Sequence, residues 1–411
     1  MRAIIIGGGL AGPVLALELQ RREISCKIFE RRDNAAFDGG NIALSPNALR
    51  VLDHMGVYDR VAKQGWNYEE FQILSSRNLR HIGMILNGSQ QRYGYKALRI
   101  SRRTVRQTLL GTLHERGIEV RYDSKLVGIQ ETDRSTVIAT FADGYTEEAD
   151  FLIGADGIHS RVREYLNPQA IPSFSGQMGI GGSVSRSKLP ASSADMYMPC
   201  LILGKLNSFL LMPCTYSGDQ IDCAVTVEGK DRTREEWTQL QNDKPALYQH
   251  LQSLHEHEKW PEVVHVASRD VELSSLSLWP FFDLPDLSSW TSPSGRVIVI
   301  GDAAHAMPPT GGQGAAMAFE DAFTLADTLA LIDSKEAAVP TDILNQWQDV
   351  RQARVRKIRK FTSSGGDIRK SSTSTYVQVF KEWVLRIYFW CVGKERGTSW
   401  IYAYDPKAAL A

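Results

Sequence analysis

The sequence predicts an α/β protein in which a Rossmann-like parallel sheet, with its GxGxxG turn, is interleaved with a mostly antiparallel β-sheet and followed by C-terminal helices. Three observations support this prediction. The chain begins with an apolar strand, a glycine-rich turn and a helix, the order of a dinucleotide-binding unit. Two later apolar strands, near residues 150 and 297, end in small residues followed by an aspartate. Residues 172–278 contain short alternating segments rich in Ser, Gly and Thr, which are typical of antiparallel strands.

Composition narrows the class of protein. The 411 residues exceed one ordinary domain, and 47 basic residues balance 47 acidic ones, which argues against a nucleic-acid partner. Five scattered cysteines without a CxxC pair favour a reduced intracellular chain over a disulfide framework or a metal site. The N-terminus lacks the pattern of a signal peptide, and no apolar run approaches about 18 residues. We therefore expect a soluble cytoplasmic protein without membrane contact.

Residues 1–33 carry the fingerprint of dinucleotide binding. Gly7, Gly9 and Gly12 fit GxGxxG, which provides a tight turn, close approach of the pyrophosphate and close packing of the helix on the strand. Glu30 closes the second strand, where an acid accepts hydrogen bonds from ribose hydroxyls. A plain glycine-rich turn is the alternative. The preceding strand, the following helix and the spacing to Glu30 favour a bound dinucleotide.

Two further helix starts carry polar residues. Arg102, Arg103 and Arg106 open a helix within residues 100–116, where positive charge opposes the helix dipole. At least one of them is expected to meet a phosphate, although a solvated arginine face fits the spacing equally well. The pair Asp156-Gly157 follows the apolar strand near residue 150, and Ser160 is expected to cap the next helix.

Residues 296–322 form the stretch around which the rest is organised. An apolar strand ends at Gly301-Asp302, a loop rich in Pro and Gly follows, and a helix is expected over residues 315–332. Unpaired backbone N–H groups and the positive end of the helix dipole favour an anionic ligand there. Asp302 can accept hydrogen bonds from sugar or polyol hydroxyls. His305 is expected to pack structurally within the loop.

Other polar groups have simpler interpretations. The neighbouring His250, His255 and His257 allow a metal site, but nearby acids and an exposed helix favour a solvated face. The basic helix 344–361 is also expected to be a solvated face. The aromatic helix 376–392, interrupted by three charged residues, is expected to pack on the body, with a membrane or a partner as the alternative.

Taken together, these motifs resemble the FAD-dependent aromatic hydroxylases, the single-component flavoprotein monooxygenases built like para-hydroxybenzoate hydroxylase and including salicylate hydroxylase-like and tetracycline-degrading enzymes. The resemblance covers roughly residues 1–362. It favours Arg102 over Arg103 as the flavin-contacting arginine. The residues that the resemblance assigns to cofactor binding are Gly7, Gly9, Gly12, Glu30, Arg31, Arg102, Asp156, Asp302, Pro309, Gly312, Gly314 and Ala315.

The chain departs from the family pattern at two places. Ala316 stands where the family often has an asparagine, which implies one flavin contact that is missing or made by the backbone. Residues 181–183 read Gly-Gly-Ser where many members have a Trp-Arg pair, which suggests a roomier pocket. Arg186 and Tyr216 are the candidates for catalytic side chains, Arg186 to orient or protonate a substrate, and no metal site is expected.

The resemblance also implies a domain plan. An FAD-binding domain would comprise residues 1–72, 98–171 and 279–362. A substrate-binding β-sheet domain would comprise 73–97 and 172–278, and a helical tail 363–411. FAD would be the cofactor and NADPH or NADH a transient reductant.

The implied reaction is hydroxylation or epoxidation of an aromatic or polyketide-like small molecule by O₂, through a flavin C4a-hydroperoxide. A flavin oxidase or dehydrogenase on the same fold is one alternative. A flavin-binding scaffold without turnover is the other, and the intact Asp156-Gly157 motif weighs against it. The sequence indicates neither the substrate nor the oligomeric state.

Overall fold

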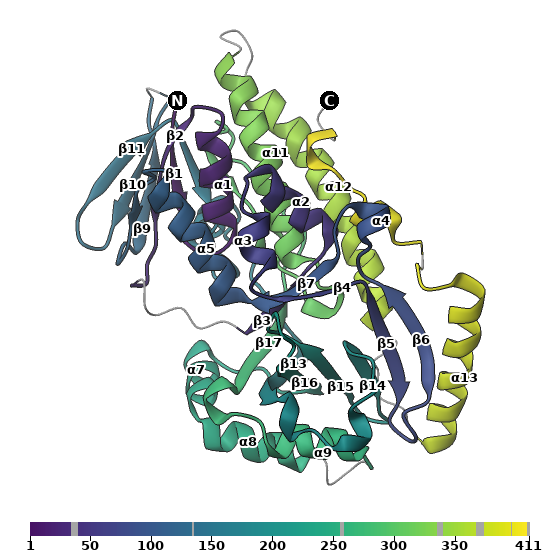
Figure 1. Ribbon diagram of the computed structural model, residues 1–411. Coiled ribbons are helices and arrows are strands. Elements are labelled where there is room, and N and C mark those ends of the chain that lie inside the picture. The colour runs from purple at the N-terminus through teal and green to yellow at the C-terminus, as the bar shows by residue number, and fades with distance from the viewer. Residues whose placement is uncertain are drawn as a thin grey trace.

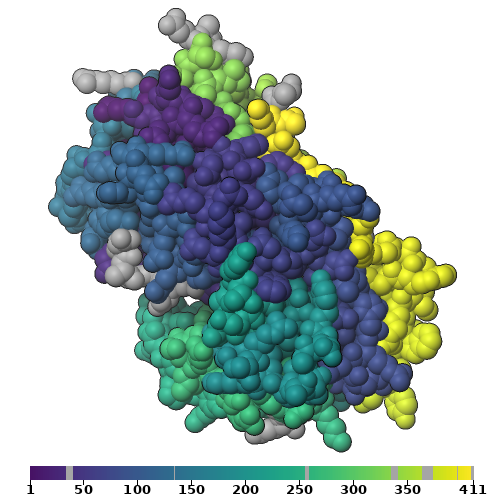
Figure 2. Space-filling view, in the orientation of Figure 1, coloured from purple at the N-terminus to yellow at the C-terminus, as the bar shows by residue number. Residues whose placement is uncertain are grey.

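The computed structural model describes residues 1–33, 40–133, 135–254, 259–334, 340–366, 374–395 and 397–408. One half of the molecule holds a parallel sheet flanked by helices, and the other half is a large sheet covered on its outer side by three short helices (Figure 1). The C-terminal segment runs down one side of both halves and stands out as a ridge in the space-filling view (Figure 2). The expected α/β class with interleaved sheets is confirmed.

The N-terminal half is built on a five-stranded parallel sheet. Its central strands are apolar on both faces, and Ile4, Ile5 and Ile153 are buried, because helices cover both sides of a parallel sheet. The strand order is β18-β12-β1-β2-β8. The strands are β1 (Arg2–Ile6), β2 (Ser25–Phe29), β8 (Val120–Arg121), β12 (Phe151–Gly154) and β18 (Val297–Val299).

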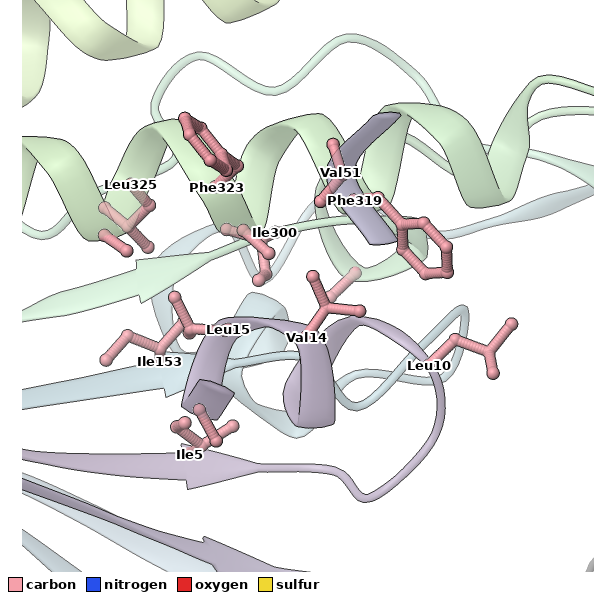
Figure 3. Close-up of a cluster of buried hydrophobic side chains, with 14 of the residues drawn as sticks. Ile5, Leu10, Val14, Leu15, Val51, Ile153, Ile300, Phe319, Phe323 and Leu325 are labelled. Atoms are coloured by element: carbon pink, nitrogen blue, oxygen red, sulfur yellow. The ribbon is translucent and has the colours of Figure 1, made fainter. Parts of the chain in front are cut away.

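Three helices pack on this sheet: α1 (Ala11–Gln20), α5 (Arg102–Glu115) and α11 (Gly314–Ser334). Helix α11 packs directly on α1, and the apolar side chains of both helices meet above the strands (Figure 3). This core holds the carboxyl ends of β1, β12 and β18 at one edge of the sheet, where ligands of parallel sheets bind.

Two small antiparallel sheets flank the parallel one. The first is β9 (Leu126–Glu131), β10 (Val137–Phe141) and β11 (Thr146–Ala149). The second is β3 (Asn41–Leu44), β7 (Ala97–Ser101) and β4 (Trp66–Tyr68), and it leads from one half of the molecule to the other.

The second half is a seven-stranded sheet of order β17-β13-β16-β15-β14-β5-β6. All its pairs are antiparallel except β14 with β5, as the alternating sequence predicts. Its strands are β5 (Glu70–Ser75), β6 (His81–Leu86), β13 (Ser173–Ser185), β14 (Cys200–Leu203), β15 (Ser208–Pro213), β16 (Gln220–Glu228) and β17 (Ser277–Asp283). The helices on its outer face are α7 (Arg234–Asn242), α8 (Lys244–Ser253) and α9 (Glu262–Arg269).

The remaining helices connect or cover these sheets. The expected helices 315–332, 344–361 and 376–392 are present, each with slightly different ends. The other α-helices are α2 (Pro46–His54), α3 (Tyr58–Ala62), α4 (Gln90–Tyr93), α6 (Arg161–Leu166), α10 (Asp302–His305), α12 (Pro340–Gly366), α13 (Thr375–Val392) and α14 (Ser399–Tyr402). The 3₁₀ turns are η1 (Arg186–Lys188), η2 (Ala191–Ser193), η3 (Leu273–Ser275), η4 (Pro309–Gly311) and η6 (Pro406–Ala408).

Candidate active site

A cavity of about 590 Å³ lies between the parallel sheet and the seven-stranded sheet. Its lining comes from the carboxyl ends of β1, β12 and β18 on one side and from β5, β14, β15, β16 and β17 on the other. A second cavity, of about 430 Å³, shares Gly7, Glu30, Arg31 and Asp156 with the first. The two cavities therefore meet at the glycine turn after β1.

The glycine turn, residues 7–12, leaves room for a ligand because its glycines have no side chains. Gly7 has φ +113°, and a Cβ there would lie 2.4 Å from the backbone oxygen of Ala155. A Cβ on Gly12 would lie 2.0 Å from the oxygen of Gly7, so this position needs glycine for α1 to pack closely. Gly9 lines the larger cavity and has open space at its Cβ position. The three glycines thus have the roles that GxGxxG predicts.

Glu30 holds the shape of this turn. Its Oε2 accepts a hydrogen bond from the backbone N–H of Gly8 at 2.7 Å, and its Oε1 accepts one from Arg32 N–H at 2.9 Å. Arg31 lines both cavities, and burial together with the nearby charges of Arg234 and Arg32 lowers its pKa. This crowding of positive charge is an environment that an anionic ligand stabilises.

One buried carboxylate oxygen of Asp156 can still accept a hydrogen bond. Its Oδ2 accepts hydrogen bonds from the N–H groups of Arg161 at 2.8 Å and Val162 at 3.4 Å, at the start of α6. Its Oδ1 is buried without a hydrogen-bond partner in the part of the chain that the structure describes. Burial raises the pKa of this carboxyl more than its hydrogen bonds lower it. Because Asp156 lines both cavities, a ligand hydroxyl can supply the missing donor.

The arginines of α5 divide into different roles. Arg102 is the first residue of the helix and lines the larger cavity, whereas Arg103 is exposed and is not among the lining residues. Arg106 is buried, and its Nε donates to the oxygen of Gly8 at 2.7 Å. Burial lowers the pKa of Arg106. At the start of this helix, Arg102 therefore faces the cavity and Arg106 stabilises the glycine turn. The spacing in the sequence did not indicate this second role.

The loop after β18 forms the opposite wall. Asp302, Pro309, Gly312, Gly314 and Ala315 all line the larger cavity. Helix α11 begins at Gly314, so its unpaired N–H groups and the positive end of its dipole lie at the cavity. A Cβ on Gly314 would lie 3.9 Å from Asp302 Oδ1. The carboxylate and the helix start thus face the same space, as the sequence predicts.

A cluster of buried charged residues stabilises the loop after β18. His305 Nε2 lies 2.5 Å from Asp321 Oδ2, which also accepts the Gly301 N–H at 3.0 Å. Arg351 Nε donates to Asp321 Oδ1 at 2.8 Å, and Arg351 Nη1 donates to Glu320 at 2.8 Å. Burial alone would raise the pKa of Asp321, but the charges of His305 and Arg351 lower it to about 2. The structure therefore places His305 in a packed structural role.

The basic helix 344–361 is therefore not a uniformly solvated face. Arg351 and Arg354 are buried, and both guanidinium groups bind Glu320. The expectation was wrong because the acidic partners, Glu320 and Asp321, lie buried on another helix, α11. Only contacts between distant segments distinguish these two arginines from the exposed Arg356 on the same helix.

The other half of the cavity is largely apolar. It carries a few polar side chains that the sequence did not single out. Arg99 on β7 forms an ion pair with Asp222 on β16, and their side chains are 12% and 7% exposed. Tyr68 is buried and shares a hydrogen bond with Asn87. The apolar lining on this side includes Phe71, Ile73, Leu201, Leu210, Trp279 and Phe281.

Comparison with known proteins agrees with this geometry. Residues 1–362 match the profile of the family described as "FAD binding domain". The chain belongs to the FAD-dependent aromatic hydroxylases. The resemblance predicted from the sequence and the assignment of FAD are confirmed, and so is the assignment as an FAD-dependent monooxygenase.

Two curated relatives and one solved structure illustrate the likeness. The hydroxylase is 28% identical to 3-amino-4-hydroxybenzoate 2-monooxygenase PtnB3 of Streptomyces platensis, over 89% of this chain and 87% of the relative. It is 27% identical to 3-hydroxybenzoate 6-hydroxylase of Klebsiella oxytoca, over 100% and 98%. A salicylate hydroxylase in complex with its substrate superposes with a TM-score of 0.80 at 23% identity, over 100% of this chain and 97% of that one.

The two candidate catalytic residues of the hydroxylase lie elsewhere. Arg186 begins the 3₁₀ turn after β13 and does not line the larger cavity. Tyr216 is 66% exposed in the turn between β15 and β16 and also lies outside the lining. Because a catalytic group must touch the reacting molecules, neither position supports a catalytic role. The polar residues that do line the substrate side include Arg99 on β7, Tyr68 on β4 and Asn87 just after β6.

The structure also shows where the two departures of the hydroxylase from the family pattern lie. Residues 181–183 do not line the cavity. A Cβ on Gly181 would lie 2.2 Å from the oxygen of Cys223, so these glycines allow close strand packing and do not widen the pocket. Ala316 is buried and outside the lining.

No metal site emerges from the residues of the hydroxylase that the structure covers. His255 and His257 lie outside the described residues, and within those described no group of three potential ligands could hold a metal ion. No described helix is long and apolar enough to cross a membrane.

Proposed function

We propose that this hydroxylase uses NAD(P)H and O₂ to hydroxylate or epoxidise an aromatic or polyketide-like small molecule. One observation carries the proposal. The same cavity runs from the glycine turn at Gly7 and Asp156, past the loop at Asp302, into an apolar compartment whose lining includes Arg99, the partner of Asp222 in an ion pair. Cofactor and substrate can therefore meet without leaving the interior.

The residues on the side of the parallel sheet fit FAD. Glu30, Arg31 and Asp156 would face the adenosine and pyrophosphate part, and Asp302 the ribityl hydroxyls. When bound, the flavin supplies electron transfer from NAD(P)H and activation of O₂. The protein supplies position, and the positive N-terminus of α11 stabilises negative charge beside the ring.

The residues on the substrate side indicate what the pocket recognises. Apolar and aromatic side chains suit a flat ring, and β17 contributes the aromatic lining residues Trp279 and Phe281. Arg99 is a cation on this wall with a side chain only 12% exposed, and it would orient a phenolic or carboxylate oxygen. Burial raises the pKa of Tyr68, more than the Asn87 hydrogen bond and the Arg99 charge lower it, so its hydroxyl remains a donor. We propose a substrate with an acidic oxygen on an aromatic ring.

The reaction type is tested by isotope incorporation. The purified yellow protein is supplied with NAD(P)H, ¹⁸O₂ and a panel of hydroxybenzoates and larger phenols. A monooxygenase places one ¹⁸O atom in the product and consumes one NAD(P)H for each turnover. Reduction of the flavin by substrate without NAD(P)H would indicate an oxidase or dehydrogenase. Absence of NAD(P)H oxidation across the panel would indicate a flavin-binding scaffold.

Asp302→Ala is expected to weaken FAD binding roughly 10- to 100-fold, because hydrogen bonds to a charged acceptor contribute about 1.5–3 kcal/mol. Fluorescence titration of the apoprotein with FAD measures the change. Asp333→Ala, at the far end of α11, is the matched control and should bind FAD as the wild type does. Equal affinity of all three proteins would contradict the role of Asp302.

Tyr68→Phe is expected to raise KM for a phenolic substrate about 2- to 10-fold, because one neutral hydrogen bond is lost. The control is Tyr93→Phe, since Tyr93 is equally buried but its hydroxyl lies 3.3 Å from Ser399, outside the cavity lining. Steady-state kinetics of both variants measure the change in KM. A change in Tyr93→Phe as large as that in Tyr68→Phe would show a general effect of packing.

We also propose that the protein works in the cytoplasm. All five cysteines are free thiols, which suits a reducing compartment.

A further inference from the structure

Helix α13 turns an aromatic face to the solvent. Tyr376 is 88% exposed, Phe380 71% and Trp390 86%, and Trp383 and Ile387 are also exposed. Its buried residues include Gln378 and Glu382. Leu385 and Phe389 are buried as well, but most apolar side chains of α13 face the solvent, whereas the apolar stripe of an ordinary surface helix faces the core. Figure 1 shows α13 along the outer side of β6, and Figure 2 shows the same segment standing out from the body.

The inward face fixes this orientation. Glu382 accepts hydrogen bonds from Ser75 at 2.8 Å and from Arg77 at 2.9 Å. Phe389 fills the space beside Gly83, where a Cβ would lie 2.1 Å from the ring. Rotating the helix to bury its aromatic residues would expose Phe389 and break the buried ion pair of Glu382. The aromatic face is therefore a stable outer surface.

The shape of the face favours a flat partner. At 100° per residue, the exposed apolar side chains other than Val392, the last residue of the helix, cover an arc of about 160° from Trp390 to Tyr388, with no charged residue inside it. Lys381 and Arg386 lie at its two borders. A narrow stripe would suit pairing with one other helix, whereas a broad arc bordered by basic residues suits a helix lying in a lipid surface. Trp and Tyr are also the residues that prefer the membrane–water interface.

The charges around the face are complementary to anionic lipid. Glu382 is the one acidic residue within α13, and it is buried against Arg77. The turn between β5 and β6, next to the N-terminal half of α13, carries the exposed Arg80 in addition to Arg77, whose charge is offset by its ion pair with Glu382. We propose that α13 docks the protein, without spanning, on a membrane surface that contains anionic phospholipid. Our sequence-based expectation of no membrane contact did not take into account that Glu382 faces inward.

The docking helix also adjoins the substrate compartment. Leu385 and Phe389 of α13 belong to the same buried cluster as Phe71, Ile73 and Leu201, and the last three line the larger cavity. Docking would thus place the outer wall of the substrate compartment beside the lipid.

Vesicle flotation of the FAD-loaded protein tests the proposal. The probes are vesicles of phosphatidylcholine alone and of phosphatidylcholine with phosphatidylserine. We expect binding to be about tenfold tighter or more with phosphatidylserine, because each nearby Lys or Arg contributes about 1 kcal/mol at an anionic surface. The variant Phe380→Glu/Trp383→Glu should lose binding. The control Leu331→Glu alters an exposed apolar residue of α11 and should bind as the wild type does.

FAD content and sedimentation velocity of each protein are measured alongside. Retained FAD in Phe380→Glu/Trp383→Glu shows that the variant is folded. The proposal is overturned if the wild type floats with neither vesicle, or equally with both. It is also overturned if the wild type forms a dimer that Phe380→Glu/Trp383→Glu disrupts while no vesicle binding occurs, since the face would then pair with a second copy.

Discussion

Arg351→Met is expected to lower the free energy of unfolding by about 3–5 kcal/mol, the usual cost of removing one partner from a buried ion pair. Arg351 is fully buried and donates to both Glu320 and Asp321. Methionine fills part of the volume but leaves two carboxylates with fewer partners in a dry interior. The effect also reaches the cofactor loop, because Asp321 Oδ2 accepts the N–H of Gly301, directly before Asp302.

Urea unfolding of the FAD-free protein measures this change, and FAD titration measures its effect on the loop. Arg356→Met is the matched control on the same helix. Arg356 is 55% exposed and pairs with Asp286 at 3.2 Å, so its loss should cost less than about 1 kcal/mol. If the two variants unfold at the same urea concentration, the buried cluster does not stabilise the fold in the way described. Arg351→Lys should recover only part of the loss, since lysine cannot bind two carboxylates with a planar fork.

The cofactor half of the site could be predicted because its chemistry is local in sequence. Gly7 and Asp302 each follow the end of a strand, and Gly12 lies in the first turn of the helix after Gly7, so a short segment determines both the structure and the ligand. The same holds for Asp156, although its buried Oδ1 without a partner emerges only from the folded chain.

The substrate half could not be predicted because its polar residues pair across distant strands. Arg99 and Asp222 are 123 residues apart, and each reads as an isolated charge within an apolar strand. Such a charge in a buried strand is the one signal that could have identified them, since it requires a partner. Arg186, by contrast, is suggested by its place shortly after the stretch where many family members have a Trp-Arg pair, and that place lies outside the cavity.

The direction in which side chains point was the second property that could not be predicted from the sequence. The sequence located helix 376–392 but gave equal weight to its three charges, whereas the fold turns Glu382 inward and leaves Trp383 outside. Similarly, six basic residues of helix 344–361 looked alike, although two of them lie in the core. Helical periodicity identifies faces, but only the neighbours of a helix determine which face is buried.

Arg99→Met is expected to lower kcat/KM on the order of 100-fold for a substrate that carries a phenolate or carboxylate, with FAD still bound. Arg99 is the basic residue that lines the cavity from β7, and its side chain is only 12% exposed. A charge-assisted hydrogen bond in such surroundings contributes about 1.5–3 kcal/mol. The loss should appear mainly in KM if Arg99 binds the ground state, and in kcat if it orients the ring for oxygen transfer.

The ion pair complicates this variant, because Arg99→Met leaves Asp222 as a buried, uncompensated charge. The double variant Arg99→Met/Asp222→Asn removes that charge and should recover stability without recovering kcat/KM. Arg99→Lys keeps the positive charge and should retain intermediate activity. An analogue without the acidic oxygen provides the decisive comparison: it should react equally slowly with the wild type and with the double variant. If the double variant instead turns over the acidic substrate at the wild-type rate, Arg99 serves only to join β7 to β16, and substrate recognition lies elsewhere in the compartment.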